Sequence, residues 1–595
     1  MDMADKNASQ TECEMTGAQM VIRALKDQGV THIFGYPGGA VLPIYDALYA
    51  ANDITHVLVR HEQGATHAAE GYARSTGKPG VVLVTSGPGA TNAVTGIADA
   101  LLDSIPMVVI TGQVATPLIG TDAFQECDTV GVTRPCTKHN WLVKDVNDLA
   151  RVIHEAFQVA TTGRPGPVVI DLPKDVQFNV GRYIGPENVA HRTYKPQTEP
   201  DMSAIEMAVH WMASAKRPVF YTGGGIINSG DDAVKALREL VAITNFPITS
   251  TLMGLGSYPA SGKNWLGMVG MHGTYEANNA MHDCDLMICL GARFDDRVTG
   301  RLSAFAPYAR KIHLDIDVSQ INKNVRVDLP IVADAGKAIA AMVRVWKDKK
   351  CKSDAHAMDD WWRTIDRWRE KRCLEFKNST TTIKPQHAID RLYELTKNHD
   401  TYITTEVGQH QMWAAQRYHF EEPKRLMTSG GLGTMGYGLP AALGVQMAHP
   451  DSLVIDIAGE GSVQMTMQEI VTAAQYNLPI KIFILNNSYL GMVRQWQQLM
   501  HGQRYSQSSN EVQPDFVKLA EAMGATGLRV DKPEDLDAAI EKMITTPGPV
   551  MLDVHVDKFE NCYPMIPSGA AHNEMILSDA DEEATEVSDE GKILV

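Results

Sequence analysis

Short runs of β-branched and other apolar residues alternate with Ala-rich helical stretches along most of the chain. Several of these runs are apolar at both odd and even positions, as expected of parallel strands that helices cover on both faces of a sheet. The clearest runs are residues 81–84, 107–110, 168–170, 219–221, 286–290, 453–457, 480–485 and 550–554. The pattern therefore predicts an α/β protein made of doubly wound open sheets.

Two segments interrupt this pattern and indicate where the chain divides. Residues 185–200 are polar and contain three prolines, and residues 347–384 are rich in charge and Trp without a strand signal. At roughly 150 residues to a domain, a chain of 595 residues accommodates three such sheets with connecting segments. We expect domains at 14–186, 200–347 and 384–558, and a partly disordered, acidic tail at 559–595.

The chain is acidic, with 54 Lys and Arg against 71 Asp and Glu and a formal net charge of −17. No local basic face is visible in the sequence, so a nucleic-acid partner is not expected. The N-terminal segment has neither an apolar core nor an Arg-rich pattern, and no run of eighteen apolar residues occurs, so no membrane span is expected. Eight Cys without a C-x-x-C pair favour free thiols. The expected location is cytoplasmic, or organellar if a transit peptide has been removed.

Glycine-rich turns follow several of the predicted strands, where doubly wound sheets bind their ligands. These turns are residues 35–39, 86–89, 223–225, 430–438 and 459–461. Residues 431–436 match G-x-G-x-x-G, with Asp456 about twenty residues further on. At most a three-residue strand precedes the match, so an NAD-type dinucleotide site is the weaker interpretation.

Two predicted strands are each followed by residues that can supply oxygen ligands to a metal ion. The strand at 453–457 leads to Gly459-Glu460-Gly461-Ser462, and the strand at 481–485 leads to Asn487 and Tyr489. A helix predicted at 466–475 makes this a strand–helix–strand unit, which returns both ends to the same edge of the sheet. Glu460, Asn487 and the Tyr489 carbonyl would hold Mg²⁺ and leave about three positions for phosphate oxygens and water. Ordinary turn chemistry, with Gly for positive φ and Asn for capping, is the alternative.

The spacing of these two turns resembles the diphosphate-binding motif of thiamin-diphosphate enzymes. The acid of that motif is usually Asp, whereas this chain has Glu460. Most of the chain, from about residue 17 to 573, is similar to the catalytic subunits of the acetohydroxyacid synthase (acetolactate synthase) family. The matching stretches are residues 35–40, 60–74, 85–92, 123–126, 163–176, 270–273, 294–300, 406–416, 485–487, 491–497 and 561–575. The resemblance implies thiamin diphosphate, Mg²⁺ and FAD as cofactors, bound by the first and third domains and by the middle domain, respectively.

Glu62 is the candidate proton relay of the thiamin aminopyrimidine. It follows the apolar run at 56–59 and opens an Ala/Gly-rich helix, where burial would raise a carboxyl pKa toward the range useful for proton exchange. A helix N-terminal acid favoured by the dipole is the alternative. The family places this glutamate in one subunit and the diphosphate motif in the other, which implies a homodimer at least, or a homotetramer.

The resemblance assigns further cofactor contacts at the diphosphate end and beside the thiazolium ring. These are Gly38, Gln409, His410, Gly433, Met435, Gly461, Ser462 and Met492. For His410 the alternative is a satisfied turn histidine, and for Met492 it is core packing.

The substrates implied are the 2-keto acids pyruvate and 2-ketobutyrate, for which a guanidinium and an apolar wall are needed. Arg297 and Trp496 match the acceptor-recognition pair, with Phe124, Gln125, Lys174 and Met271 near the pocket mouth. A surface ion pair with Asp295 or Asp296 is the alternative for Arg297, core packing for Trp496 and a solvated side chain for Lys174. Gln125 is counted with Glu62, Arg297 and Trp496 as catalytic.

The middle block carries turns that resemble the FAD contacts of the family. The expected residues are Gly223, Gly224, Gly225, Met271, Arg293, Asp315 and Asp334, with Arg164 reaching in from the first block. On their own, these residues are equally typical of ordinary α/β loops.

The resemblance implies a carboligase that decarboxylates pyruvate and transfers the two-carbon unit to pyruvate or 2-ketobutyrate. This is the first common step of branched-chain amino acid biosynthesis, and a small regulatory subunit is a possible partner. The alternatives are a pyruvate oxidase, a simple 2-keto acid decarboxylase, an NAD-type oxidoreductase and a non-catalytic binding protein. The decarboxylases typically carry adjacent histidines, and no His-His pair occurs in this chain.

Overall fold

The computed structural model describes residues 14–187 and 189–584. The chain forms two compact units, one from residues up to 73 and from 78 to 195, the other from residues 74–77 and from 196 onward. The first unit holds one large sheet and the second holds two.

The first unit contains a six-stranded parallel sheet in the order β3-β2-β4-β5-β7-β6. Its strands are β2 (His32–Tyr36), β3 (Thr55–Leu58), β4 (Gly80–Val84), β5 (Met107–Gln113), β6 (His139–Leu142) and β7 (Pro167–Pro173). Its helices are α1 (Gly17–Asp27), α2 (Leu42–Tyr49), α3 (Glu62–Thr76), α4 (Pro88–Asn92), α5 (Val94–Asp103), α6 (Thr129–Thr133), α7 (Val146–Thr161) and α8 (Lys174–Phe178). A separate antiparallel pair joins β1 (Glu14–Thr16) to β8 (Val180–Arg182).

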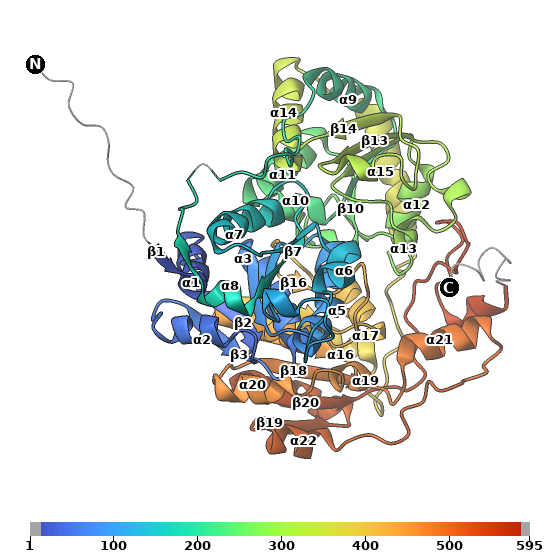
Figure 1. Cartoon of the computed structure of the whole chain (residues 1–595). Coiled ribbons are helices and arrows are strands. Elements are labelled where there is room, and N and C mark those ends of the chain that lie inside the picture. The colour runs from blue at the N-terminus through green and yellow to red at the C-terminus, as the bar shows by residue number, and fades with distance from the viewer. Residues whose placement is uncertain (1–13, 188, 585–595) are drawn as a thin grey trace, which may run out of the picture. The chain divides into compact units, whose positions relative to one another are not determined.

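The first sheet of the second unit has the order β11-β10-β9-β12-β13-β14 and is also parallel. Its strands are β9 (Pro218–Thr222), β10 (Ile248–Ser250), β11 (Trp265–Met268), β12 (Leu286–Leu290), β13 (Arg310–Asp315) and β14 (Leu329–Val332). The helices around it are α9 (Met202–Ser214), α10 (Gly224–Asn228), α11 (Asp231–Thr244), α12 (Tyr275–Asp283), α13 (Asp296–Thr299), α14 (Ala335–Asp348) and α15 (Ala355–Arg369). Helices α9, α11 and α14 pack together, and α12 packs with α15 (Figure 1).

The second sheet of this unit has the order β16-β15-β17-β18-β20-β19, again parallel. Its strands are β15 (Thr401–Thr405), β16 (Leu426–Met427), β17 (Leu453–Ala458), β18 (Lys481–Asn486), β19 (Thr526–Val530) and β20 (Val550–His555). Its helices are α16 (Pro385–Thr396), α17 (Gln409–Arg417), α18 (Gly438–Ala448), α19 (Glu460–Val463), α20 (Glu469–Gln475), α21 (Gly491–Met500), α22 (Phe516–Ala522) and α23 (Leu536–Thr545).

The strands of this last sheet are buried on both faces, which explains their continuous apolar sequence. Ile455 and Ile457 of β17 join the hydrophobic core cluster with α16, α17 and α23, whereas Val454 joins the cluster with α18, α20 and α22. Phe483 and Ile484 of β18 divide in the same way. Successive side chains thus enter opposite cores, as a helix–sheet–helix sandwich requires.

The α/β architecture with doubly wound sheets is confirmed, and all eight predicted strands are present. The helix predicted at 466–475 is wrong at its start, because α20 begins at Glu469. Thr466 lies in the preceding turn, where its hydroxyl donates to the Gly436 carbonyl at 3.0 Å.

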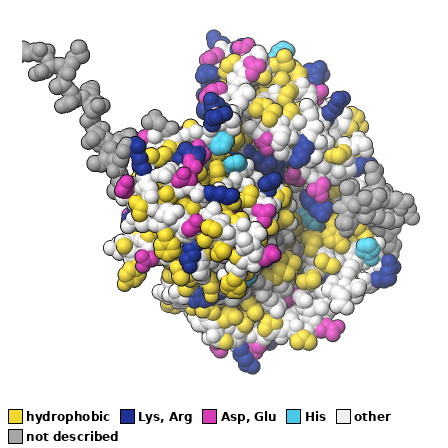
Figure 2. Space-filling view, in the orientation of Figure 1, with side chains coloured by type: hydrophobic (Ala, Val, Ile, Leu, Met, Phe, Trp, Pro, Cys, Tyr) yellow, Lys and Arg dark blue, Asp and Glu magenta, His cyan; other side chains and the backbone are white. Residues whose placement is uncertain are grey.

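The predicted domain boundaries and the acidic tail stay predictions. Residues 585–595 lie outside the described residues, whereas Cys562, Met565 and Ile566 in the same predicted tail are buried. None of the described helices has the length and apolar character needed to cross a membrane. On the face shown in Figure 2, Lys and Arg side chains lie among Asp and Glu side chains.

Candidate functional site

Beside its first strand, each six-stranded sheet has a point at which its strand order reverses. This point lies between β2 and β4, between β9 and β12, and between β15 and β17. Ligands of doubly wound sheets bind in the crevice outside the carboxyl ends of the two strands that flank such a point. The glycine-rich turns singled out in the sequence at 86–89, 223–225 and 459–461 follow three of these strands, and the one at 35–39 begins in the last two residues of β2.

A pocket of about 80 Å³ opens at the reversal point of the third sheet. Its wall brings together predicted site residues from turns that lie far apart in the sequence. They are Gln409, His410, Met435, Glu460, Gly461, Ser462, Asn487, Tyr489 and Met492. Gly433 and Trp496 are not in this wall; Gly433 is in an exposed turn and Trp496 is half-buried on α21. Met492 and Trp496 lie outside the hydrophobic core clusters, so core packing does not account for either.

Glu460 and Asn487 lie side by side in this pocket. The Glu460 carboxylate accepts hydrogen bonds from the Asn487 backbone N–H and from Asn510 Nδ2, the latter at 2.9 Å. Only 1% of Glu460 is exposed, and this burial raises the pKa of its carboxyl to about 7. A buried carboxylate with few partners gains much from a nearby cation, because the ion compensates its lost hydration.

The Asn487 side chain is held at both ends. Its Oδ1 accepts from the Tyr489 backbone N–H at 3.1 Å, and its Nδ2 donates to Gln409 Oε1 at 3.2 Å. Ser488 between them has a φ of 61°, which lets the chain turn tightly after β18. The amide oxygen of Asn487 is therefore turned toward the Tyr489 side of the loop.

Glycines let the backbones of this pocket approach each other and leave room for a ligand. A Cβ at position 459 would lie 2.9 Å from the His410 ring, and one at position 491 would lie 2.2 Å from Gln409 Oε1. Ser462 Oγ accepts from Gly459 N–H at 3.2 Å and thereby fixes the turn. Any side chain at 459 or 491 would displace a residue of the pocket wall.

His410 presents an unsatisfied nitrogen in the same wall. It is 7% exposed, its Nε2 has no hydrogen-bond partner among the described residues, and burial lowers its pKa to about 3. Buried polar atoms are rarely left without partners, so an orphaned ring nitrogen in a pocket indicates a ligand. Oxygen donors for a divalent cation, an orphaned imidazole and a glycine cradle together fit a metal–diphosphate group.

Glu62 belongs to the first unit, where it begins α3 after β3. It is 9% exposed, and its Oε2 accepts from Asn92 Nδ2 at 2.9 Å. Gly89 lies beside its other oxygen, since a Cβ there would be 3.4 Å from Oε1. At the neighbouring turn, a Cβ on Gly38 would lie 2.5 Å from Thr85, so both turns require glycine.

Phe124, Gln125 and Lys174 lie near the carboxyl edge of the first sheet. Phe124 is 88% exposed on a loop that the Glu126 carboxylate holds through the backbone N–H groups of residues 120–123. Lys174 begins α8 and is half-buried.

A larger pocket of about 670 Å³ contains Arg297 and Met271. Arg297 forms an ion pair with Asp296 at 3.3 Å, as the alternative interpretation expects, but 57% of its side chain is exposed. An ion pair this exposed is worth little, and the guanidinium can still bind a carboxylate. Arg301 lines the same pocket and pairs with Glu574 at 3.4 Å.

The residues predicted to contact FAD in the second unit have structural partners. A Cβ on Gly223 would lie 2.4 Å from the Gly291 carbonyl oxygen, and Gly225 also packs against Gly291. Asp334 caps α14 by accepting from Lys337 N–H at 3.0 Å, and Asp315 accepts from Asp317 N–H at 2.8 Å. Arg293 pairs with Asp295 at 3.1 Å.

Arg164 lies in the first unit, where it donates to Ser104 Oγ at 2.8 Å and to the Leu101 carbonyl at 3.0 Å. These contacts close the C-terminal end of α5.

Two residues of the third-sheet site were missed by the sequence analysis. Asn510, which donates to Glu460, comes from a loop fifty residues further along the chain and belongs to no recognisable motif. Gln495 donates to the Cys562 carbonyl and accepts from Gln409 Nε2 at 2.7 Å. Gln495 lies within residues 491–497, a stretch that resembles the family, and this resemblance was the one feature of the sequence that could have identified it.

Three models of the thiamine pyrophosphate enzymes match the chain. The N-terminal TPP binding domain matches residues 15–132, the central domain matches 205–342 and the C-terminal TPP binding domain matches 406–554.

Curated relatives match over nearly the whole chain. It is 50% identical to the acetolactate synthase isozyme 3 large subunit of Escherichia coli K12, covering 95% of this chain and 99% of that protein. It is 48% identical to the acetolactate synthase large subunit of Haemophilus influenzae, covering 96% and 99%. It is 47% identical to the mitochondrial acetolactate synthase catalytic subunit of Saccharomyces cerevisiae, covering 96% and 85%. The chain belongs to the acetolactate synthase large-subunit family of the thiamine pyrophosphate enzymes.

Proposed function

We propose that the chain decarboxylates pyruvate and joins the two-carbon unit to a second molecule of pyruvate or to 2-ketobutyrate. This reaction opens branched-chain amino acid biosynthesis. The observation that carries the proposal is the pairing of Glu460 with Asn487 beside the orphaned Nε2 of His410. In a chain with three TPP-enzyme domains, this arrangement suits a divalent cation and a diphosphate.

In the proposed site, the Glu460 carboxylate, the Asn487 amide oxygen and the Tyr489 carbonyl hold Mg²⁺. His410, Gly433, Met435, Gly461 and Ser462 would bind the diphosphate end, and Met492 would contact the pyrimidine and thiazolium rings. When bound, thiamin diphosphate supplies an electron sink for the pair released as CO₂ leaves. Glu62 holds the proton that the aminopyrimidine exchanges, and its buried position keeps water from competing for that proton.

The proposed assembly is a homodimer in which one subunit supplies Glu62 and the other supplies the diphosphate site. A homotetramer, a small regulatory subunit and a cytoplasmic location stay predictions. Phe124, Gln125, Lys174 and Trp496 are proposed to line the substrate pocket beside Arg297.

The second sheet supports FAD as a further cofactor. Numbered within that sheet, its strand order is 3-2-1-4-5-6, the arrangement that binds dinucleotides at the point of reversal. Gly223, Gly224, Gly225 and Arg293 follow the two strands at this point. They are proposed to approach FAD through their backbone, with Met271, Asp315, Asp334 and Arg164 as the further predicted contacts.

Arg297→Lys is expected to raise the KM for 2-ketobutyrate about tenfold, because Lys cannot bind a carboxylate through two parallel hydrogen bonds. The measurement is the initial rate of acetohydroxybutyrate formation at a fixed pyruvate concentration and varied 2-ketobutyrate. Arg301→Lys is the control, since Arg301 lines the same pocket and already pairs with Glu574. Equal shifts in both variants would argue against acceptor binding by Arg297.

The proposed function is tested by incubating the protein with pyruvate, thiamin diphosphate, Mg²⁺ and FAD and assaying acetolactate. Acetolactate as the main product is expected. Acetaldehyde would indicate a decarboxylase, acetyl phosphate would indicate a pyruvate oxidase, and a nicotinamide requirement would indicate an NAD-type oxidoreductase. Absence of CO₂ release would indicate a binding protein.

A further inference from the structure

Three buried side-chain amides form a chain from the candidate metal site to the segment after β20. Asn487 Nδ2 donates to Gln409 Oε1 at 3.2 Å, and Gln409 Nε2 donates to Gln495 Oε1 at 2.7 Å. Gln495 Nε2 then donates to the Cys562 carbonyl at 3.2 Å. None of the three amide residues is more than 5% exposed.

The direction of this chain follows from its fixed partners. An amide side chain can be turned over without changing its shape, so its orientation must be inferred from groups that only donate or only accept. The Cys562 backbone N–H donates to Gln495 Oε1 at 2.8 Å, and the Cys562 carbonyl accepts from Gln495 Nε2. Because a backbone N–H cannot accept and a carbonyl cannot donate, Gln495 is fixed at both ends.

The fixed orientation of Gln495 propagates to Asn487. Gln409 must turn its nitrogen toward Gln495 Oε1, and the Glu560 carbonyl, which also only accepts, receives the same nitrogen at 3.1 Å. Gln409 Oε1 then requires a donor, so Asn487 must present Nδ2 to it. The oxygen of Asn487 is thereby kept free of Gln409 and on the Tyr489 side of the loop.

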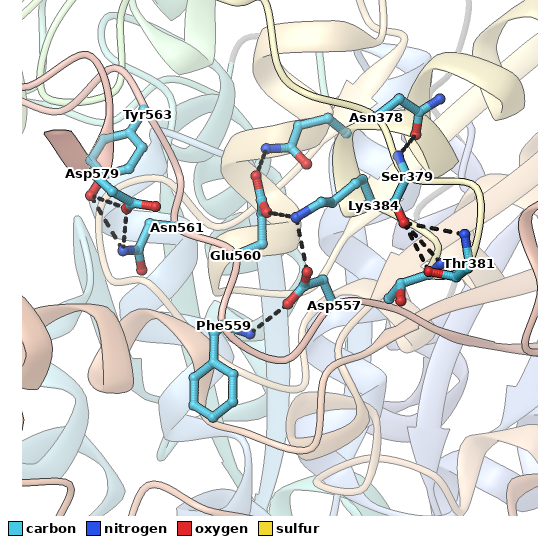
Figure 3. Close-up of polar contacts among 12 residues, drawn as sticks. Asn378, Ser379, Thr381, Lys384, Asp557, Phe559, Glu560, Asn561, Tyr563 and Asp579 are labelled. Carbon is cyan, nitrogen blue, oxygen red and sulfur yellow. Dashed lines mark hydrogen bonds and ion pairs between the residues drawn. The ribbon is translucent and has the colours of Figure 1, made fainter.

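The backbone at Glu560, whose carbonyl helps to orient the Gln409 amide, is held in place by ion pairs. The Glu560 carboxylate accepts from Lys384 Nζ at 2.5 Å and from Gln386 Nε2 at 2.7 Å, and Lys384 also binds Asp557 at 2.8 Å. Figure 3 shows Lys384 between the carboxylates of Asp557 and Glu560. Arg494 Nη2 also donates to the Glu560 carbonyl at 2.8 Å. Glu560 is therefore held both through its side chain and through its carbonyl.

We propose that Gln495 is a positioning residue for the metal site: acting through Gln409, it keeps the oxygen of Asn487, and not the nitrogen, available to Mg²⁺. Cations bind the oxygen of an amide and are repelled by its NH₂ group. This inference rests on the proposed function and assigns Gln409 to orientation of the metal ligand, because both ends of its amide already have protein partners.

The test measures Mn²⁺ binding by electron paramagnetic resonance of the free ion, with full-length protein and saturating thiamin diphosphate. Gln495→Met keeps the length of the side chain and removes its donor and acceptor. We expect its Kd for Mn²⁺ to rise about tenfold, the lower end of the effect of partners that orient a metal ligand. A Glu buried at this position is expected to be neutral, so Gln495→Glu keeps the oxygen that accepts from the Cys562 N–H and from Gln409 Nε2 and can donate its O–H to the Cys562 carbonyl. Its Kd is expected to stay within about threefold of the original value.

Gln446→Met is the matched control. Gln446 is equally buried in the same unit and donates to the carbonyls of His449, Pro450 and Ser452, remote from the amide chain. Its loss is expected to lower the melting temperature and leave the Kd for Mn²⁺ unchanged.

The outcomes separate the inference from the proposed function. Absence of cofactor-dependent Mn²⁺ binding in the unaltered protein would overturn both the site and the inference. Normal binding in the unaltered protein with the same Kd in Gln495→Met would overturn the inference alone. If Gln495→Met does not fold, Gln495→Asn decides, because a side chain one methylene shorter cannot bond Cys562 and Gln409 together; an unchanged Kd there would also overturn it.

Discussion

Glu62→Gln is expected to slow acetolactate formation by about 10²- to 10⁴-fold, the usual contribution of a positioned acid–base group. Gln keeps the shape of the side chain and an oxygen that can accept from Asn92 Nδ2, so the fold and the cofactor affinity are expected to change little. What it cannot do is take up and release a proton. The most specific readout is hydrogen–deuterium exchange at C2 of the thiazolium ring, measured by NMR after acid quench.

Glu155→Gln is the control for this substitution, because Glu155 is a mostly buried glutamate of the same unit that pairs with Arg151 at 3.1 Å. Its exchange rate and turnover are expected to stay within about twofold of the original values. Exchange at the original rate in Glu62→Gln would show that another group moves the proton.

Glu460→Gln is expected to weaken Mg²⁺ binding by at least about 100-fold, above the range seen when only the partners of metal ligands are altered. The substitution removes the one carboxylate of the proposed metal site and retains an oxygen for Asn510 Nδ2. Affinity for thiamin diphosphate is expected to fall with it, because the cation screens the diphosphate from the buried wall. Both constants can be followed by fluorescence titration and calorimetry.

Glu469→Gln is the matched control, since Glu469 is fully buried on α20 and bonds the Thr472 hydroxyl at 2.7 Å. It is expected to leave Mg²⁺ affinity unchanged. A similar loss in both variants would mean that burial of any carboxylate in this sheet, and not the contact of Glu460 with the ion, governs binding.

The strands that the sequence predicts are those buried on both faces. β4 and β12 are entirely buried and read as unbroken apolar runs, and the equally buried β5 and β7 contain such runs before their polar residues. Some strands escaped prediction because they are short or half-exposed, as in β10 with three residues and the partly exposed edge strand β19. At β16, which has two residues, the sequence allowed at most a three-residue strand. The local hydrophobic pattern carries little information about such strands, because they form mainly by hydrogen bonding to the neighbouring strand of the sheet.

The order of the strands in each sheet could not be predicted from the sequence either. Numbered within each sheet, the first and third sheets share the order 2-1-3-4-6-5, although no sequence repeat links them. The pairing of Glu460 with Asn487 could nevertheless be predicted, because a strand–helix–strand unit returns both strand ends to one edge. The contacts of Asn510 and Gln495 could not be predicted, because Asn510 binds Glu460 from a loop distant in sequence and Gln495 is linked to Asn487 only through the side chain of Gln409.

Some predicted site residues also have a local structural role. Asp334 precedes an apolar helical stretch, which is the usual position of an N-cap, and it does cap α14. A carboxylate that caps a helix can still face a ligand, so the proposed FAD contact needs its own test. For Gln409, by contrast, the local sequence gave no sign that three protein groups would take up its amide.

The most direct measurement is a crystal structure of the protein with thiamin diphosphate and Mn²⁺, with the ion located by anomalous scattering. We expect one ion bound by the Glu460 carboxylate and Asn487 Oδ1, with the diphosphate beside His410 Nε2. An ion elsewhere, or a cofactor bound with Glu460 and Asn487 turned away from it, would contradict the account.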